Sequence, residues 1–128
     1  MIPNSSPPSL SGVTVIIVED NMLVADSVRM LLETLDSNVA GMAGTVERGI
    51  DLVESNEFDV ALLDIDLRGR SVLPVVRAVQ KKGKPFLFIS GYGDETILPE
   101  ELRSATRLNK PLDAEGLVAA IREVLADS

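Results

Sequence analysis

The sequence predicts one α/β domain in which helices cover both faces of a parallel sheet. Short apolar runs rich in β-branched residues alternate with longer stretches whose apolar residues recur every three or four positions. No repeat or low-complexity block interrupts this alternation, and 128 residues at 45% hydrophobic are enough for one core but not for two. Because alternating strands and helices form parallel sheets through right-handed crossovers, we expect a doubly wound (βα)5 sheet.

The first third of the chain predicts two strands with a helix between them. Residues 13–18 form a run that is apolar except for Thr14, which suits a strand buried on both faces. Residues 23–35 carry leucine and valine on one side and charged residues on the other, as an amphipathic helix does. Residues 39–43 make the second strand, after which Gly44 and Thr45 offer a turn and a helix N-cap.

The middle of the chain repeats this unit. Apolar positions spaced along residues 46–53 predict the second helix, and residues 60–63 predict a third strand that ends at Asp64. Valines along residues 72–79 predict a third helix. Pro74 lies in the first turn of that helix, where proline is tolerated.

The last third predicts two more strands and a final helix. Residues 85–89 form the fourth strand and residues 106–108 a short fifth strand. Between them, residues 94–104 are expected to hold a short helix with Pro99 as its first residue. Residues 117–125 carry the apolar stripe of the closing helix.

The composition limits the chemistry and the partners. Because the chain has no Cys and no His, its chemistry must come from carboxylates, hydroxyls and lysines. The net charge of −8 disfavours nucleic acid and anionic lipid, and no apolar run approaches the roughly 20 residues of a membrane span. Residues 1–12, rich in Pro and Ser and unlike a signal peptide, are expected to form a disordered arm before a domain at 13–128 of a cytoplasmic protein.

Polar side chains follow four of the predicted strands at the point where each strand ends. These are the acidic pair Glu19-Asp20, then Asp64, Ser90 and Lys110. The carboxyl ends of parallel strands meet at one edge of a sheet, so three carboxylates would come together there and would favour a Mg²⁺ ion among them. A hydroxyl and an ammonium beside them fit a phosphoryl guest, with the central Asp64 as its nucleophile.

This set of residues, in this order and spacing, resembles the response-regulator receiver family of two-component systems, and the resemblance covers the chain after Gly12. The resemblance implies a flavodoxin-like fold with strand order 2-1-3-4-5. It implies a magnesium ion held by the side chains of Asp20 and Asp64 and by the backbone carbonyl of Asp66, with Glu19 acting through a bound water. It also implies Ser90 as the family's Ser/Thr and a cis bond between Lys110 and Pro111.

The same resemblance implies a single-domain response regulator. Its phosphoryl donor would be a phosphohistidine on a histidine kinase or a histidine phosphotransfer protein, docked at the first helix. Since the final predicted helix ends close to Ser128, we expect the signal to pass to a separate downstream protein. Self-catalysed phosphoryl uptake and hydrolysis would be its only chemistry, so we expect no enzyme in the ordinary sense.

Two departures from the family pattern concern the switch. Arg107 occupies the position, three before the lysine, where the family usually has an aromatic residue. The stretch 88–93 is similar to the Phe-Ala-Thr-Gly-x-Tyr pattern of a subgroup of single-domain receivers that also lack that aromatic. Ser90, Tyr92 and Arg107 are therefore the switch candidates, and we hypothesise that Tyr92 overhangs the phosphoryl group and shields it from water.

Other interpretations of these residues stay open at this point. Glu19-Asp20 alone is also typical of a helix N-terminus, and Asp66 of a turn. Asp64-Ile65-Asp66 resembles the Asp-x-Asp pair of haloacid-dehalogenase-type phosphatases, although Arg68 stands where those enzymes have Thr or Val. The altered switch position also fits a pseudo-receiver that binds proteins without phosphorylation.

Overall fold

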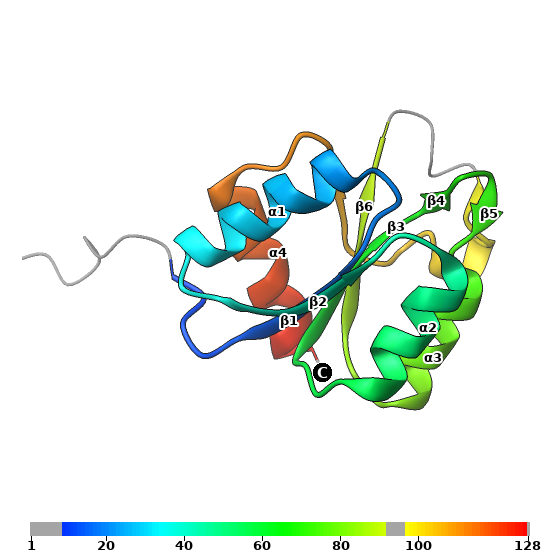
Figure 1. Ribbon diagram of the computed structural model, residues 1–128, viewed down its shortest axis with the longest axis horizontal. Helices are drawn as coiled ribbons and strands as arrows, with labels where there is room; N and C mark the ends of the chain where they lie inside the picture. The colour runs from blue at the N-terminus through cyan, green and yellow to red at the C-terminus, as the bar shows by residue number, and fades with distance from the viewer. Residues whose placement is uncertain (1–8, 92–96, 128) are drawn as a thin grey trace, which may run out of the picture.

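The computed structural model describes residues 9–91 and 97–127, which form a parallel sheet between two layers of helices (Figure 1). The sheet has five strands in the order β2-β1-β3-β6-β7. Their bounds are β1 (Thr14–Val18), β2 (Asn38–Ala43), β3 (Val60–Asp64), β6 (Phe86–Ser90) and β7 (Arg107–Asn109). Since β6 and β7 are the fourth and fifth strands of this sheet along the chain, the predicted flavodoxin-like order 2-1-3-4-5 is confirmed.

The helices divide evenly between the faces of the sheet. Two pack on one face and two on the other (Figure 1). The first pair is α1 (Met22–Thr34) and α4 (Ala114–Ala126), and the second is α2 (Val46–Ser55) and α3 (Leu73–Lys81). Side-chain caps begin three of them: Asn21, Thr45 and Asp113 each accept a hydrogen bond from a backbone N–H of the first turn.

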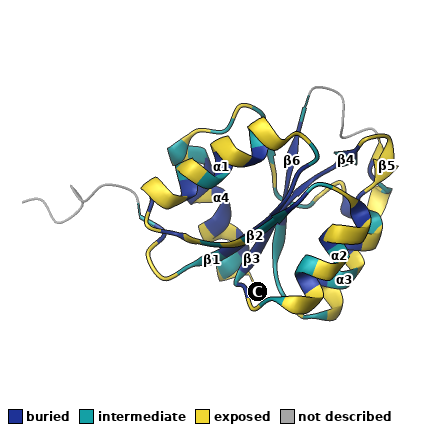
Figure 2. Cartoon of the chain, in the orientation of Figure 1, coloured by how far each residue is buried: buried dark blue, intermediate teal, exposed yellow. Residues whose placement is uncertain are grey.

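The central strands are buried along most of their length because both of their faces are covered (Figure 2), and their residues are apolar apart from Thr14 and the strand-end residues Asp64 and Ser90. Along β1, Val15 and Ile17 face α1 and α4, whereas Ile16 and Val18 face α2 and α3. Since successive side chains of a strand point to opposite faces, each of these strands contributes to two separate apolar clusters. The continuous hydrophobic runs in the sequence follow from this two-sided burial.

Within the described residues, the chain between β6 and β7 holds the three-residue 3₁₀ turn Glu100–Leu102, in the stretch where we predicted a short helix. Pro99 directly precedes the turn with extended ψ of 148°, so it is not the first helical residue. Leu102 is buried against the cluster under α2 and α3. Leu98, just before the turn, is buried in the same cluster. Two buried leucines are enough to hold one turn, but they do not provide the apolar stripe of a longer helix.

A two-stranded antiparallel ribbon, absent from our prediction, follows β3. It consists of β4 (Asp66–Leu67) and β5 (Arg70–Ser71). The two residues between the strands, Arg68 and Gly69, have φ of 56° and 80°, as a type I′ hairpin turn requires. Leu67 anchors the ribbon, because it is buried in the cluster under α2 and α3.

The predicted arm over residues 1–12 ends too late in the chain. Residues 1–8 lie outside the described residues, but Leu10 is 2% exposed and packs in the cluster under α1 and α4. Its N–H donates to the carbonyl of Leu35 over 2.7 Å, and Arg122 donates to the carbonyl of Ser9 over 2.9 Å. The ordered domain therefore begins before Val13.

Lys82 closes the end of α2. Its Nζ donates to the carbonyls of Val53 and Asn56 and lies 5.4 Å from the centre of the Phe58 ring. Carbonyls at a helix C-terminus have no partner within the helix, so this ammonium supplies one from a different element.

In the described part of the chain, no helix has the length and apolar content needed to cross a membrane.

Candidate functional site

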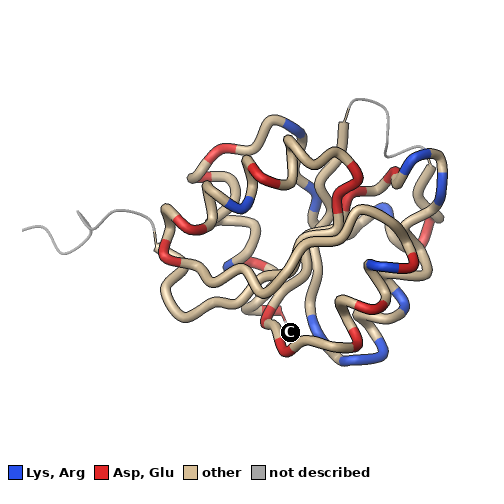
Figure 3. The backbone as a smooth tube through the Cα atoms, in the orientation of Figure 1, with Lys and Arg blue, Asp and Glu red and all other residues tan. Residues whose placement is uncertain are grey.

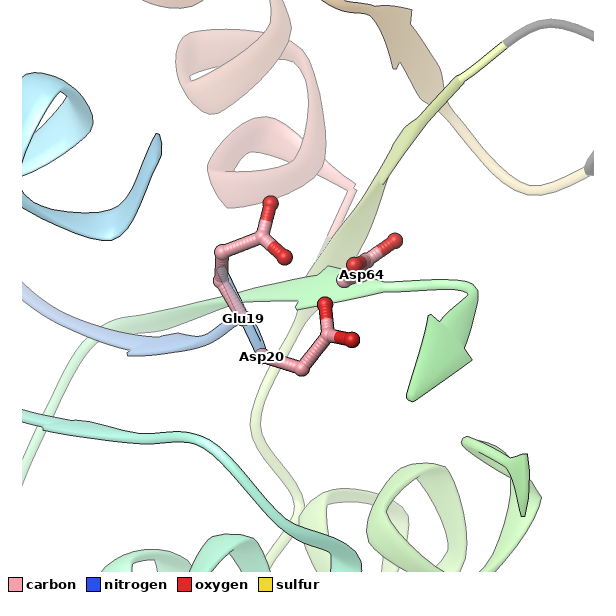
Figure 4. A group of neighbouring side chains, drawn as sticks. All are labelled: Glu19, Asp20 and Asp64. Atoms are coloured by element: carbon pink, nitrogen blue, oxygen red, sulfur yellow. The ribbon is translucent and has the colours of Figure 1, made fainter. Parts of the chain in front are cut away.

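Three carboxylates meet at the carboxyl edge of the sheet. Glu19 and Asp20 follow β1 directly, and Asp64 is the last residue of β3 beside it. Figure 4 shows the three side chains close together at the ends of β1 and β3. One carboxylate oxygen from each lies within 4.8 Å of the others. The prediction that strand ends gather these residues is confirmed by this geometry.

Lys110 provides the cation that faces this group. Its Nζ lies 2.6 Å from Oε1 of Glu19 and 3.3 Å from Oδ2 of Asp64. The backbone N–H of Lys110 donates to the carbonyl of Ser90 over 2.9 Å, which fixes the loop after β7 to the end of β6. The Lys110–Pro111 bond is cis, as the resemblance implied.

Ser90 lies at the same edge with its side chain fully buried. Its hydroxyl donates to Oδ1 of Asn109 over 3.4 Å, a long hydrogen bond. We did not single out Asn109 in the sequence, although it directly precedes Lys110. Because this hydrogen bond is long, the hydroxyl can be redirected toward another acceptor at small cost.

The carboxylates perturb one another strongly. Burial, followed by the neighbouring Glu19 carboxylate, raises the pKa of Asp64 to about 8, and Lys110 opposes this only in part. Burial also raises the pKa of Glu19, but its contacts with Asp64 and Lys110 outweigh burial and hold that pKa below its ordinary value. Burial lowers the pKa of Lys110, whereas the two carboxylates raise it further, so the ammonium stays charged.

The donor set fits a small divalent cation. The side chains present do not neutralise the cluster, since the pKa of Asp64 stays near 8 despite Lys110. Oε1 of Glu19 is completely buried and has no hydrogen bond among the described residues, its near neighbour being the Lys110 ammonium. Carboxylate oxygens are ligands that Mg²⁺ prefers, and it usually takes one or two of them together with water and phosphate oxygens.

The side chain of Asp66 does not join the carboxylate cluster. Its Oδ1 accepts the N–H of Gly69 over 2.8 Å and so closes the turn of the β4–β5 ribbon, while its own N–H lies 3.4 Å from Oδ1 of Asp64. The backbone of Asp66 thus lies next to the site even though its carboxylate faces the turn. This arrangement is compatible with a role for the backbone carbonyl alone.

The switch candidates have different placements. Arg107 is exposed on β7, the edge strand, where it lies opposite Phe88. Tyr92 lies outside the described residues, so its predicted position over the site stays a prediction. Arg68, which we noted only as a departure from the phosphatase pattern, lies with its Nε 3.8 Å from Oδ2 of Asp20.

An apolar groove runs beside the carboxylates. It has a volume of about 410 Å³ and lies between α1 and the loop that follows Lys110. Leu23 and Met22, at the start of α1, are 80% and 52% exposed. The groove is lined by Leu23, Val24, Ser27, Val28, Leu31, Lys110, Pro111 and Leu112.

Comparison with known families gives one match that spans most of the chain. The family described as the response regulator receiver domain matches residues 15–122. The nitrate/nitrite response regulator protein NarP of Escherichia coli K12 is 33% identical over 121 residues, which cover 90% of this chain and 56% of NarP. The sensory transduction protein LytT of Bacillus anthracis is 27% identical over 112 residues, 85% of this chain and 46% of LytT. This chain thus spans about half the length of these relatives.

Solved structures give a consistent result. SdrG from Sphingomonas melonis Fr1 has a TM-score of 0.79 and 32% identity, covering 88% of this chain and 96% of SdrG. The signal receiver domain of a modulated diguanylate cyclase from Desulfovibrio desulfuricans G20 has a TM-score of 0.80 and 28% identity, covering 90% of this chain and 94% of that domain. Both likenesses extend over nearly the whole fold described above.

Proposed function

This chain belongs to the response regulator receiver domain family, and we propose that it is a phosphorylation switch in which Asp64 accepts a phosphoryl group with the help of Mg²⁺. One observation carries the proposal. Asp64, 2% exposed at the end of β3, shares a carboxylate cluster with Glu19 and Asp20 and is 3.3 Å from the ammonium of Lys110. A buried carboxylate in this setting is costly for stability, which favours a chemical role.

Asp20 and Asp64 would hold the Mg²⁺ through their side chains and Asp66 through its backbone carbonyl, with Glu19 acting through a water. When bound, the cation supplies positive charge that favours the ionised carboxylates and offsets the charge of phosphoryl oxygens. Asp64 must be ionised to act as a nucleophile, and its pKa near 8 makes that ionisation dependent on such a cation. The proposal therefore ties phosphoryl uptake to metal binding.

In the transfer itself, an oxygen of Asp64 forms a bond to phosphorus as the bond from phosphorus to the leaving atom of the donor breaks. Lys110 stays beside that oxygen and neutralises a phosphoryl oxygen, and Ser90 turns its hydroxyl from Asn109 to donate to another. The movement of Ser90 would then be the first step of the switch. Arg107 and Tyr92 would respond to it in place of the usual aromatic residue.

The partners follow from the same proposal. A histidine kinase or a histidine phosphotransfer protein would supply the phosphoryl group and dock on the apolar groove beside α1, because this groove adjoins Lys110. An unidentified downstream protein in the cytoplasm would bind the phosphorylated form more tightly, since equal affinity for both forms would transmit nothing. Apart from its own phosphorylation and hydrolysis, the domain would catalyse no reaction.

The two other interpretations have less support. The phosphatase interpretation needs the side chain of Asp66 as an acid beside Asp64, but that carboxylate accepts the N–H of Gly69 instead. The pseudo-receiver interpretation rests on Arg107 alone, whereas the acidic cluster and Lys110 are both in place. The orientation of Asp66 and the presence of the acidic cluster with Lys110 therefore both favour phosphoryl uptake over these two functions.

The test is the mass of the intact protein after incubation with acetyl phosphate, with Mg²⁺ or with a chelator. The wild type should gain one phosphoryl group only with Mg²⁺, and Asp64→Asn should gain none. Asp51→Asn, a change at an exposed carboxylate of α2, is the matched control and should behave as the wild type. A folded wild type that gains nothing would support the pseudo-receiver, and steady phosphate release independent of Asp64 would support an enzyme.

A further inference from the structure

The β4–β5 ribbon places a second cation beside the acidic cluster. Arg68, at the tip of the ribbon, lies with Nε 3.8 Å from Oδ2 of Asp20. Figure 3 shows basic positions of this ribbon next to the acidic positions at the carboxyl edge of the sheet. Lys110 contacts Glu19 and Asp64, so among the described ion pairs Arg68 is the cation that pairs with Asp20.

The backbone of Arg68 is held in place by its surroundings, whereas its side chain is exposed to solvent. The backbone of the turn is held by the hydrogen bond from Gly69 to Asp66 and by Leu67, which is buried in the cluster under α2 and α3. The side chain of Arg68 itself is 76% exposed. A fixed backbone with an exposed side chain lets the guanidinium reach Asp20 and also leave it.

The geometry has a consequence for metal binding. Asp20 is one of the three carboxylates that can share an ion, and it is also the partner of Arg68. A guanidinium and a divalent cation cannot both remain close to one carboxylate without repelling each other. We propose that Arg68 is a positioning residue that competes with the divalent cation for Asp20 and so weakens the affinity of the site for Mg²⁺.

This inference rests on the proposed Mg²⁺ site but not on phosphorylation. In its terms, Arg68 keeps Asp20 paired in the metal-free protein and swings into solvent when the cation binds. The cost of breaking an exposed ion pair is small, so the site is made weaker without being closed. A domain with this device would bind Mg²⁺ less tightly than the same domain with a neutral residue at the turn.

The variants follow from the turn geometry. Arg68→Asn removes the charge and creates the Asn-Gly pair that two-residue hairpins favour, so the ribbon should keep its shape. Arg68→Lys keeps the charge and should restore wild-type behaviour. Arg70→Asn removes a charge from the same ribbon at a residue paired with Glu47, away from the acidic cluster, and is the matched control.

The experiment is calorimetric titration of the metal-free full chain with Mg²⁺ at low and at high salt, after thermal unfolding has shown that each variant folds. Arg68→Asn should bind about two- to fivefold more tightly than the wild type at low salt, and this difference should shrink at high salt because the pair is exposed. Arg68→Lys and Arg70→Asn should match the wild type.

Equal affinity of Arg68→Asn and the wild type would overturn the inference while leaving the proposed function intact. Tightening by Arg70→Asn to the same degree would also overturn it, because the effect would then belong to the net charge of the ribbon. If the folded wild type binds no Mg²⁺ at all, the proposed function fails and this inference fails with it.

Discussion

Asp64→Asn should stabilise the metal-free protein, and the gain should grow with pH. In the unfolded chain this carboxyl ionises near its ordinary pKa of 3.8, whereas in the fold its pKa is about 8. A carboxyl whose folded pKa is raised contributes its full stability in acid and loses it as the pH rises from the unfolded pKa through the folded one. The wild type therefore loses stability relative to the variant between about pH 4 and pH 8.

The size of the effect follows from that interval. Each pH unit between the unfolded and the folded pKa lowers the free energy of unfolding of the wild type by about 1.4 kcal/mol. Roughly three such units lie between the unfolded pKa and pH 7, so Asp64→Asn should be more stable than the wild type by about 4 kcal/mol at pH 7. The amide has the shape of the carboxyl, and Glu19 keeps its 2.6 Å contact with Lys110, so the substitution adds no new buried charge. At pH 4 the two proteins should be nearly equal in stability.

The assay is urea unfolding in the presence of a chelator, followed by far-UV circular dichroism, because the chain has no Trp and a single Tyr. The control Asp51→Asn should unfold like the wild type at every pH. Excess Mg²⁺ should stabilise the wild type above neutral pH and should do much less for Asp64→Asn. Parallel stability curves for the wild type and Asp64→Asn across this pH range would refute the reasoning.

Three further predictions concern other parts of the molecule. Lys110→Ala leaves Glu19, which is completely buried, without its cation and should cost about 2–4 kcal/mol in metal-free urea unfolding; an unchanged midpoint would show that the pair is not stabilising. Leu10→Ala should lower the free energy of unfolding by about 2–4 kcal/mol in the same assay, since that side chain is 2% exposed. A negligible loss would instead support the predicted disordered arm over residues 1–12. Leu23→Asp, at a residue 80% exposed in the groove, should leave stability within about 0.5 kcal/mol and labelling by acetyl phosphate unchanged, but should slow phosphotransfer from a histidine donor; equal phosphotransfer rates would exclude this docking surface.

The sheet was predictable because its strands are buried on both faces. The runs at 13–18 and 60–63 are apolar apart from Thr14, so they lack the alternating polar positions that would suit an exposed face, and residues 23–35 and 46–53 have helical spacing. The ribbon after β3 was not predictable in this way, since strands of two residues have no measurable periodicity. Its turn also contains Arg68, where Asn or Gly is the usual signal.

The N-terminal boundary was missed for a similar reason. Leu10 is an isolated apolar residue among Pro and Ser, so composition assigns it to a flexible segment. Its burial depends on a space between the ends of α1 and α4, and this space exists only in the folded molecule. Tertiary packing of one side chain leaves no local pattern in a sequence.

The acidic site was predictable from a rule of topology. Glu19, Asp64 and Lys110 are far apart in the chain, and only the convergence of strand ends in a parallel sheet brings them together. Contacts that depend on side-chain direction were not predictable. The carboxylate of Asp66 accepts a hydrogen bond within its own turn, and Asn109 accepts the hydroxyl of Ser90. Neither contact can be inferred from the residue types alone.

The contact of Lys82 with the end of α2 makes this lysine a natural reporter of local opening. Its amine is occupied by two carbonyls and covered by Phe58, whereas the amine of Lys81, one position earlier, belongs to an exposed residue. An amine-reactive reagent should therefore modify Lys81 quickly and Lys82 only when α2 frays. The ratio of the labelling rates of Lys82 and Lys81, measured by peptide mass spectrometry, reports how often that end of the helix opens. Lys81 serves as the internal reference for the rate at an exposed amine.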